Sequence, residues 1–330
     1  MPTYNRGHII GRSIRSIQAQ TIRDWELIVV DDGSTDDTRV LIEEFSRADR
    51  RIRLLANDGR TGPAGARNAG IRASQAEMVA FLDSDDQWDL EALANVARER
   101  QRDSSAVLIG SNYRMVDAID GSATTMKSFL FNTILPWWEN CPPAAAVIPV
   151  DVIRRDVHAI CQPQIFLCMA IAGYSWVQTS SAAVRRDALF AVGLFDECLQ
   201  RTEDIDLWLK LSRLGPITYL DEVHATYDIG GRKHGTGIRY KFYHPSRRHS
   251  AYIEALHHLR CLERIAEAYP LNAEQGELVK HRRIAHHQRC AVAGLRECRL
   301  RGLAHLFICL TSKEQRVRLR KETKEFFHLQ

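Results

Sequence analysis

The sequence predicts an α/β fold in which a mostly parallel β-sheet is flanked by helices, followed by a helical C-terminal extension. Two observations point to this class. Short apolar runs rich in β-branched residues alternate with amphipathic segments up to about residue 110, a pattern typical of parallel strands joined by crossover helices. Polar clusters at 31–37 and 83–86 follow two of these apolar runs. Since ligands of open α/β sheets bind beyond the carboxyl ends of the strands, these clusters mark the expected ligand edge.

The first helix and strand are predicted from hydrophobic spacing. Three isoleucines recur at helical intervals and indicate a helix over about 8–20. WELIVV at 25–30 is short, apolar and β-branched, which favours a buried strand. The turn DDGSTDDT, rich in residues that favour helix N-termini, follows it. The next elements are an amphipathic helix in RVLIEEFSRA (39–48) and a strand in IRLLAN (52–57).

A glycine-rich segment interrupts this series. GRTGPAGARNAG at 59–70 predicts a turn that leads into a helix. It has neither the spacing of the GxGxxG dinucleotide fingerprint nor the Lys of a Walker P-loop. EMVAFL at 77–82 predicts a strand that runs directly into the carboxylates of 83–86. The remaining elements of this half are a helix in LEALANVARERQ (90–101) and a strand in AVLIG (106–110).

The middle of the chain is less regular. Residues 111–175 contain several prolines and aromatics, and we expect irregular segments and short helices that cover a site. Regular structure is predicted again in SWVQTSSAAVRRDALFAVG, as a strand or turn followed by a helix from about Arg186. In TEDIDLWLKLSRLG, Thr202 is expected to cap a helix that ends at Gly215. ITYL at 217–220 predicts a final strand.

The composition divides the chain near residue 245. All 330 residues together are 45% hydrophobic and 26% charged, which suits about two globular domains. Residues 246–330 look wholly helical, with breaks at Pro270 and near Gly302. They hold 17 Lys/Arg against 9 Asp/Glu, whereas residues 1–245 are slightly acidic. We therefore predict one domain over 1–245 and a helical region over 246–330. Such a basic region is typical of contact with an anionic surface or of a solvated helical face.

The sequence also indicates a cytoplasmic protein. Its eight cysteines are scattered without CxxC or zinc-site spacing, which favours reduced thiols in a cytosolic protein. We read no signal peptide at the start. The longest apolar run, IFLCMAIAGYSWV at 165–177, is shorter than the roughly 20 residues that span a bilayer. The opening MPTYNR reads as the end of a strand, so we expect residues upstream of Met1 that complete a central strand.

The acidic cluster that follows the strand at 77–82 has a specific geometry. In an extended segment residues i and i+2 point the same way, so Asp83 and Asp85 are expected to aim at one spot. Two hard oxygen ligands without His or Cys suit Mg²⁺ or Mn²⁺, which take further ligands from phosphates. A turn solvated by water is the alternative. Asp31 and Asp32 have the same ambiguity, since they could cap the next helix or accept hydrogen bonds from a ribose or a base.

The segment TEDID places Glu203, Asp204 and Asp206 in the first turn of a predicted helix. Acidic side chains are favoured there by the helix dipole, which alone could explain all three. The functional interpretation makes one of them a general base. The pattern by itself leaves both interpretations open.

Taken together, five motifs resemble glycosyltransferase family 2. MPTYNR, ELIVVDDGSTDDT, GARNAGI, FLDSDD and TEDIDLWLKL occur in the order and spacing of that family over about residues 1–220. The resemblance implies a GT-A fold with a nucleotide-binding half over about 1–110 and an acceptor half over 111–245. It also implies an inverting enzyme that moves a sugar from a nucleotide-diphosphate sugar to a saccharide or lipid-linked acceptor. The setting would be polysaccharide, lipopolysaccharide or other glycoconjugate synthesis.

The resemblance assigns roles to individual side chains. Asp204 is the expected catalytic base with Glu203 beside it, and Asp85 is the expected ligand of Mg²⁺ or Mn²⁺ with Asp83 beside it. Either His234 or His224 is expected to assist at the metal or diphosphate. The expected nucleotide contacts are Thr3, Tyr4, Asn5, Asp32, Arg67 and Asp83.

Other functions remain as alternatives. A nucleotidyltransferase could share the sheet and metal site, but no loop rich in Lys or Arg lies near the strand ends to hold a triphosphate. A catalytically inactive module that binds sugar nucleotides is disfavoured, because Asp83, Asp85 and Asp204 occur together. Nucleic-acid binding is not expected, since the basic region lacks interleaved aromatics, and the missing fingerprint disfavours a dinucleotide oxidoreductase.

The end of the chain has features of a membrane-surface helix. LAHLFICL at 303–310 places four apolar residues on one face, and the strongly basic KEQRVRLRKETK follows. A helix of this kind can lie on anionic lipid, and packing against the catalytic domain is the alternative. We therefore predict a cytoplasmic protein, with peripheral contact at the inner face of the plasma membrane as an open extension.

Overall fold

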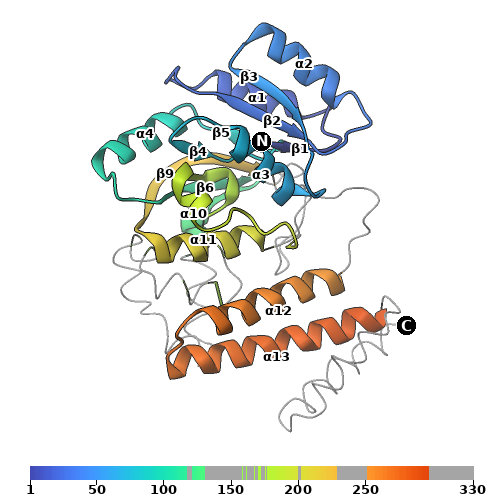
Figure 1. The fold of residues 1–330 in the computed structure, drawn as a ribbon, viewed down its shortest axis with the longest axis vertical. Helices are drawn as coiled ribbons and strands as arrows, with labels where there is room; N and C mark the ends of the chain where they lie inside the picture. Colours follow the sequence, from blue (N-terminus) through green and yellow to red (C-terminus); the bar gives the residue numbers. More distant parts are fainter. Residues whose placement is uncertain are drawn as a thin grey trace. The chain divides into compact units, whose positions relative to one another are not determined.

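The computed structural model describes two compact units. One comprises Met1–Leu167 with Ser175–Phe242, and the other Cys168–Tyr174 with Tyr243–Gln330. Figure 1 shows their elements along the chain. The residues described are 1–116, 121–130, 158, 161, 167, 170–171, 175, 177–199, 202–228 and 251–296.

The first sheet is parallel, as the alternating pattern predicts. Its strands β1 (Pro2–Thr3), β2 (Leu27–Asp31) and β3 (Ile52–Ala56) lie in the order β1-β2-β3. The register pairs Thr3 with Asp31 and Asp31 with Ala56. The carboxyl ends of all three strands therefore meet at one edge, which is where open α/β sheets bind ligands.

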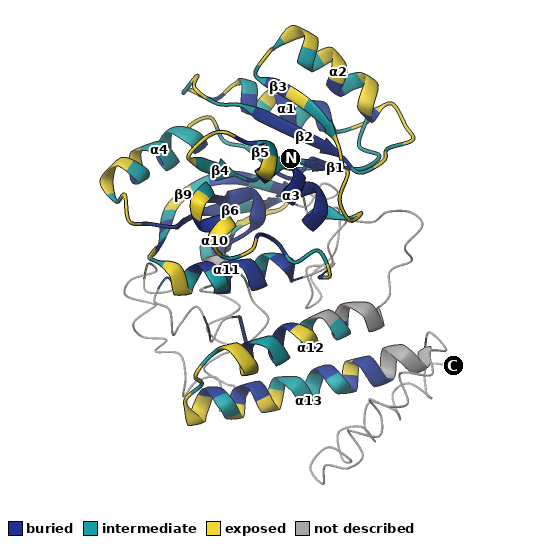
Figure 2. Ribbon diagram, viewed as in Figure 1, coloured by how far each residue is buried: buried dark blue, intermediate teal, exposed yellow. Residues whose placement is uncertain are grey.

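Helices cover both faces of this sheet. Alternate residues of β2 point to opposite sides, so Leu27 and Val29 pack with the isoleucines of α1 (Ile10–Gln18) and α2 (Thr38–Ala48). Ile28 and Val30 pack on the other side against α3 (Pro63–Ala73). Figure 2 shows the resulting buried layer in dark blue. The three isoleucines of α1 are at most 3% exposed, which explains why their spacing identified the helix.

The second sheet is mixed rather than parallel. Its order is β4-β8-β6-β9-β5, with β7 paired to β6. Only β6 and β9 run parallel, and the other pairs are antiparallel. The strands are β4 (Met78–Ala80), β5 (Gln87–Trp88), β6 (Leu108–Val116), β7 (Ala123–Thr125), β8 (Ala182–Arg185) and β9 (Ile217–Asp228). The α/β class is confirmed, and the parallel order holds for the first sheet.

Several helices accompany the second sheet. Three aromatic rings join one of them, α11, to the segment after β4: the ring centroids of Phe81, Phe195 and Trp208 lie 5.4 to 6.3 Å apart. Trp208 Nε1 donates a hydrogen bond to the carbonyl of Val177 at 3.1 Å. This buried cluster fixes α11 relative to the end of β4. The helices are α4 (Ala92–Arg102), α5 (Met126–Phe129), the 3₁₀ turn η3 (Thr179–Ser181), α10 (Arg186–Ala191) and α11 (Glu203–Leu214).

Three local predictions need correction. The irregular region expected from residue 111 begins later, because β6 continues to Val116 and is followed by β7 and α5. The final strand runs well beyond 217–220, through Asp228. Thr202 precedes α11 but does not cap it through its hydroxyl, since its φ is +62° and its side chain makes no cap hydrogen bond. Gly215 follows the last helical residue as predicted.

In the second unit the structure describes α12 (Ala251–Ala268) and α13 (Ala273–Arg296), separated near Pro270 as predicted. Ala255 and Cys290 share a buried contact between them. The predicted break near Gly302 and the segment 303–330 lie outside the described residues. The domain boundary predicted at 245 and the residues expected before Met1 stay predictions. Within the described ranges, no helix is long and apolar enough to cross a bilayer.

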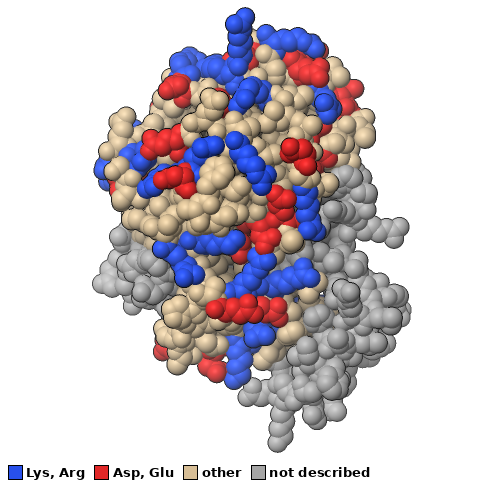
Figure 3. All heavy atoms as spheres, in the orientation of Figure 1, with Lys and Arg blue, Asp and Glu red and all other residues tan. Residues whose placement is uncertain are grey.

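Charges on the visible face are mixed. Figure 3 shows Lys and Arg side chains interspersed with Asp and Glu over this face, with no large field of either sign. This face therefore presents no extended charged surface among its described residues.

Candidate active site

The acidic turn, residues Asp83–Asp86, lies just beyond β4 and is tied down at both ends by one serine. Ser180 Oγ of η3 accepts a hydrogen bond from the backbone N–H of Asp83 at 3.1 Å and donates one to the carboxylate of Asp86. The backbone N–H of Asp86 also closes the turn onto the carbonyl of Asp83 at 3.1 Å. Asp83 and Asp86 are buried, and Asp85 is partly exposed. The turn therefore presents Asp85 toward solvent on a fixed backbone.

Helix α1 holds the same turn from the first sheet. Arg12 donates to the carbonyl of Asp85 at 2.6 Å, and Ser13 Oγ donates to the carbonyl of Ser84 at 3.0 Å. These bonds join segments about seventy residues apart in the sequence. They make the shape of the acidic turn depend on α1, which the sequence pattern alone did not indicate.

Asp85 has the properties of a ligand for a hard cation. Burial, and then the neighbouring Asp83, raise the pKa of its carboxyl group. Its Oδ2 lies 3.7 Å from the guanidinium of Arg6. Its Oδ1 is buried and, among the described residues, has no hydrogen-bond partner. A buried carboxylate oxygen without a partner is costly unless a proton or a cation satisfies it.

Asp86 has a different character from its neighbour. Burial, reinforced by the charges of Asp85 and Asp83, raises its pKa well above the ordinary value. Burial of this kind favours the neutral form of a carboxyl group. The contact of Asp86 with Ser180 serves the structure of the turn.

Arg67 bridges the acidic turn and the first turn of α11. One amino group of its guanidinium donates to Asp83 Oδ1 at 2.8 Å and the other to Glu203 Oε1 at 2.9 Å. The Arg67 and Asp83 side chains are each 3% exposed and that of Glu203 is 11% exposed. Burial opposes the charge on Arg67, but Asp83 and then Glu203 hold its pKa above the ordinary range. Two segments 120 residues apart in sequence thus share one buried cation.

The three acids at the start of α11 have separate environments. Glu203 faces Arg67, and Asp206 forms an ion pair with Lys210 at 2.6 Å. Asp204 Oδ1 accepts a hydrogen bond from the backbone N–H of Ile205 at 2.8 Å, and no described residue forms an ion pair with it. Burial, then the charge of Glu203, raise the pKa of Asp204 to about 7. Among the three, Asp204 is therefore the acid suited to exchange a proton near neutral pH.

Tyr113 is influenced by both acidic groups and was not predicted as a site residue. It is buried on β6 and donates its hydroxyl to Met126 Sδ at 3.3 Å. Burial, followed by the charges of Asp204 and Asp86, raises its pKa above the ordinary value. No sequence pattern indicated this residue, because the strand that carries it was expected to end at residue 110.

The edge of the first sheet contains the predicted nucleotide contacts. Thr3 is buried at the end of β1, and Tyr4 and Asn5 follow it. Asn5 adopts a positive φ of +49°, its backbone N–H donates to Ser34 Oγ at 2.9 Å, and its Oδ1 accepts from the N–H of Thr35 at 2.8 Å. The strand end and the DDGSTDDT turn are therefore one bonded unit.

Asp31 and Asp32 differ in role at this edge. Asp31 is buried, accepts the N–H of Ser34 at 3.1 Å, and pairs with Arg39 at 3.3 Å. Asp32 is partly exposed and accepts hydrogen bonds from the Asn57 amide at 2.5 Å and the N–H of Gly62 at 2.9 Å. Asp31 therefore shapes its own turn, whereas Asp32 joins the ends of β2 and β3 at the open edge.

The structure separates some predicted residues from this group. His224 lies on β9 with its Nε2 3.0 Å from the side-chain amide of Asn95, and burial lowers its pKa to about 4. The charged groups that influence it are Glu222 and Arg98 rather than the acidic turn. His234 lies outside the described residues. In the part of the chain that the structure describes, no three His, Cys, Asp or Glu side chains are arranged to hold a metal.

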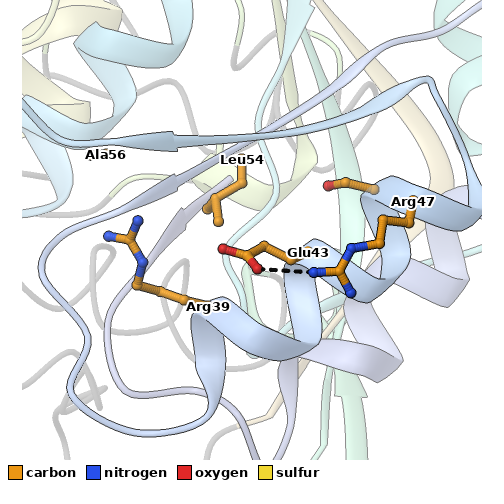
Figure 4. Close-up of a pocket in the computed structure, with 6 residues that line it drawn as sticks. Arg39, Glu43, Arg47, Leu54 and Ala56 are labelled. Atoms are coloured by element: carbon orange, nitrogen blue, oxygen red, sulfur yellow. Dashed lines mark hydrogen bonds and ion pairs between the residues drawn. The ribbon is translucent and has the colours of Figure 1, made fainter.

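A groove of about 480 Å³ lies elsewhere, between α2 and β3. Figure 4 shows Arg39, Glu43 and Arg47 along α2 facing Leu54 of the strand, with Glu43 and Arg47 paired. No residue of the acidic turn or α11 lines it. The groove and the acidic residues therefore lie in different places. We assign the site to the acidic turn and the start of α11 because of the chemistry of their side chains. The groove is lined mostly by exposed side chains, whereas Asp85, Asp86 and Asp204 have raised pKa values.

Comparisons with known proteins were made for sequence and fold. Residues 1–145 match the family described as glycosyl transferase family 2. The chain is 36% identical over 153 residues to the UDP-Glc:alpha-D-GlcNAc-diphosphoundecaprenol beta-1,3-glucosyltransferase WfgD of Escherichia coli, covering 46% of this chain and 58% of that enzyme. The chain thus spans less than two thirds of that relative's length.

Two solved structures share the fold. Residues 1–349 of S. aureus TarS in complex with UDP-GlcNAc match with a TM-score of 0.57 at 17% identity, covering 88% of this chain and 79% of that one. The mannosyltransferase PcManGT from Pyrobaculum calidifontis, in complex with GDP-Man and Mn²⁺, matches with a TM-score of 0.53 at 17% identity. That match covers 97% of this chain and 81% of the other. At these identities the likeness confirms the GT-A fold.

Proposed function

The chain belongs to glycosyltransferase family 2, and we propose from this premise that it catalyses a metal-assisted transfer with inversion. The sugar moves from a nucleotide-diphosphate donor to the hydroxyl group of an acceptor. The observation that carries the proposal is the Arg67 bridge, which joins the acidic turn to the helix turn that contains Asp204. The bridge supports the proposal that a cation-binding group and a proton acceptor share one site.

Asp204 is the proposed general base. Its pKa of about 7 allows the carboxylate to accept the proton of an acceptor hydroxyl and to release it after turnover. As the acceptor oxygen bonds to the anomeric carbon, the bond from that carbon to the diphosphate oxygen breaks. The nucleoside diphosphate leaves with the bonding electrons. A single displacement of this kind inverts the anomeric centre and needs no covalent enzyme intermediate.

Asp85 is the proposed holder of Mg²⁺ or Mn²⁺, with Asp83 beside it. The buried Oδ1 of Asp85, which has no hydrogen-bond partner among the described residues, fits a hard cation, and the donors available are carboxylate oxygens. A cation bound there would neutralise negative charge on the leaving diphosphate. The Mn²⁺ in the PcManGT complex supports this proposal by likeness of fold. Whether His234 assists stays a prediction.

The substrates are proposed by class. The UDP-GlcNAc and GDP-Man complexes of the two fold neighbours support a nucleotide-sugar donor, bound along the edge formed by Thr3, Asn5 and Asp32. The name of the E. coli relative supports a lipid-linked saccharide as the acceptor. We propose a role in the synthesis of cell-envelope polysaccharide, at the cytoplasmic face of the membrane. Membrane contact through residues 303–330 stays a prediction.

A binding assay for the donor and an assay of sugar transfer together test the proposed function. A thermal-shift screen of UDP-glucose, UDP-GlcNAc and GDP-mannose with Mn²⁺ should identify a stabilising donor. Incubation of that donor with lipid-linked saccharide acceptors should then yield free nucleoside diphosphate and a product of inverted anomeric configuration by NMR. Stabilisation by none of the donors, or a product that retains the donor configuration, would refute the proposal.

A further inference from the structure

Two arginines reach the acidic turn, Arg6 from the segment that joins β1 to α1 and Arg12 from α1 itself, and they contact it differently. Arg12 donates to the backbone carbonyl of Asp85 at 2.6 Å and so supports the shape of the turn. The guanidinium of Arg6 lies 3.7 Å from Oδ2 of the Asp85 carboxylate, which makes it an ion pair longer than a hydrogen bond. Arg6 thus brings positive charge to the functional group itself rather than to the backbone behind it.

The backbone of Arg6 is held rigidly. Its N–H donates to Thr38 Oγ1 at 2.8 Å, and its carbonyl accepts from the N–H groups of Ile9 and Ile10, both at 2.9 Å. The preceding Asn5 is bonded to the DDGSTDDT turn. A side chain on a fixed backbone loses less conformational freedom when it binds a ligand. The guanidinium of Arg6 is therefore carried by a fixed backbone at the open edge of the sheet.

The pair of Arg6 with Asp85 contrasts with that of Arg67 with Asp83. The Arg67–Asp83 pair is 2.8 Å long and each side chain is 3% exposed, so Arg67 pairs with a buried carboxyl group. Arg6 and Asp85 are each 16% exposed. Their pair therefore lies at the boundary with solvent, where an incoming ligand can meet both side chains.

The charges of the site call for such a residue. Asp83, Asp85 and Glu203 bring three carboxyl groups to the site, and Arg67 pairs with two of them. The diphosphate of a donor would add further negative charge for other cationic groups to balance. Arg6 lies beside the carboxylate of Asp85, and a guanidinium donates hydrogen bonds in a geometry that matches phosphate oxygens.

We propose that Arg6 is a donor-binding residue that contacts the diphosphate of the sugar nucleotide. The inference rests on the proposed function, since it takes the acidic turn as the place where a cation and a diphosphate meet. Arg6 then contributes to affinity for nucleoside diphosphates but little to affinity for nucleoside monophosphates. Discrimination between the two classes is the property that separates this role from support of the fold.

Calorimetric titration can measure that discrimination. UDP and UMP, with GDP and GMP as a second pair, would be titrated in Mn²⁺ into the wild-type protein and into Arg6→Gln, Arg6→Lys and Arg47→Gln. We expect Arg6→Gln to weaken binding of the diphosphate about tenfold and that of the monophosphate less than about twofold. Arg6→Lys should fall between, because it keeps the charge but loses the planar donors. Arg47→Gln is the control, since Arg47 is 72% exposed and pairs only with Glu43 among the described residues.

The outcomes separate the two proposals. An equal loss for the diphosphate and the monophosphate in Arg6→Gln, or no loss for either, would overturn the role of Arg6 while leaving the proposed function in place. Failure of the wild-type protein to bind any of the four nucleotides would overturn the proposed function and this inference with it. A loss in Arg47→Gln as large as that in Arg6→Gln would move the nucleotide to the groove of Figure 4. Thermal melts of each variant would verify that it is folded.

Discussion

The acidic turn and the first turn of α11 each bring three carboxyl groups close together, but the partners of these groups differ between the two turns. In the acidic turn, Asp83 has a buried arginine, Asp86 has a serine hydroxyl, and Asp85 has a partly exposed arginine. In the helix turn, Glu203 shares the same buried arginine and Asp206 pairs with a lysine.

The difference lies in the residue that each turn leaves available. Asp85 keeps a buried oxygen without a partner among the described residues, which suits a cation. Asp204 keeps a pKa of about 7, which suits a proton. Under the proposed function the two turns perform separate tasks, and Arg67 joins them. Further variants, added to those of Arg6, test this division.

The largest effect is expected from Asp204→Asn, which removes the proton acceptor but keeps the size of the side chain. Transfer should fall about 10²–10⁴-fold, the range that general bases contribute, while donor binding should remain near that of the wild-type protein. Steady-state transfer and calorimetric donor titration would measure the two. Asp206→Asn is the matched control, because that acid lies in the same helix turn and faces Lys210. Transfer by Asp204→Asn at the wild-type rate would rule out this base.

Arg67→Met should have the next largest effect, on folding. It leaves Asp83 and Glu203 buried without their cation, and breaking a buried pair in this way costs about 3–5 kcal/mol. Urea unfolding would measure the loss. Arg67→Met combined with Glu203→Gln should recover part of the stability, since one buried charge is then removed. A single variant as stable as the wild-type protein would show that the bridge does not hold the two turns together.

Asp85→Ala should mainly weaken binding of the divalent cation. We expect transfer to fall about 10²-fold, in line with the loss of one electrostatic contact to developing charge. Mn²⁺ titration followed by electron paramagnetic resonance should show weaker binding, which does not depend on turnover. Asp86→Asn is the control, because Asp86 lies in the same turn and its side chain accepts a hydrogen bond from Ser180. Equal Mn²⁺ affinity in Asp85→Ala and the wild-type protein would remove Asp85 as the ligand.

These variants also separate what the sequence predicts from what needs the fold. The helix at Ile10–Gln18 and the strand at Leu27–Asp31 were predictable, because local hydrophobic spacing reflects which face is buried. The antiparallel pairing of β4 with β8 was not, since it joins Met78 to Arg185. No local pattern encodes a partner that lies more than a hundred residues away along the chain.

The same limit applies to the site. The spacing of the motifs indicated Asp83, Asp85 and Asp204, because each follows a strand end or begins a helix. It did not indicate that both amino groups of Arg67 would be used by carboxylates from distant segments. Tyr113 and Arg6 were missed for the same reason, since their importance comes from neighbours that only the tertiary structure supplies.

The smallest predicted effect is a shift in pH dependence. Asp204 acts as a base only when ionised, so transfer should rise about tenfold per unit below pH 7 and level off above it. Glu203→Gln removes a charge that raises the pKa of Asp204, and the rising limb should therefore move to lower pH.

The free energy of unfolding should change with pH in the opposite direction to transfer. The folded protein holds a proton on Asp204 up to about pH 7, whereas the unfolded chain releases it near 3.8. This group therefore favours folding below pH 4 and loses that contribution as the pH rises to 7. Asp204→Asn should then be more stable than the wild-type protein at pH 8, with the advantage shrinking toward pH 4, as unfolding curves at the two pH values would measure. A stability difference that does not change with pH would mean that the carboxyl group of Asp204 has the same pKa in the folded and unfolded states. Asp204 would then behave like the solvated acids of an ordinary helix terminus.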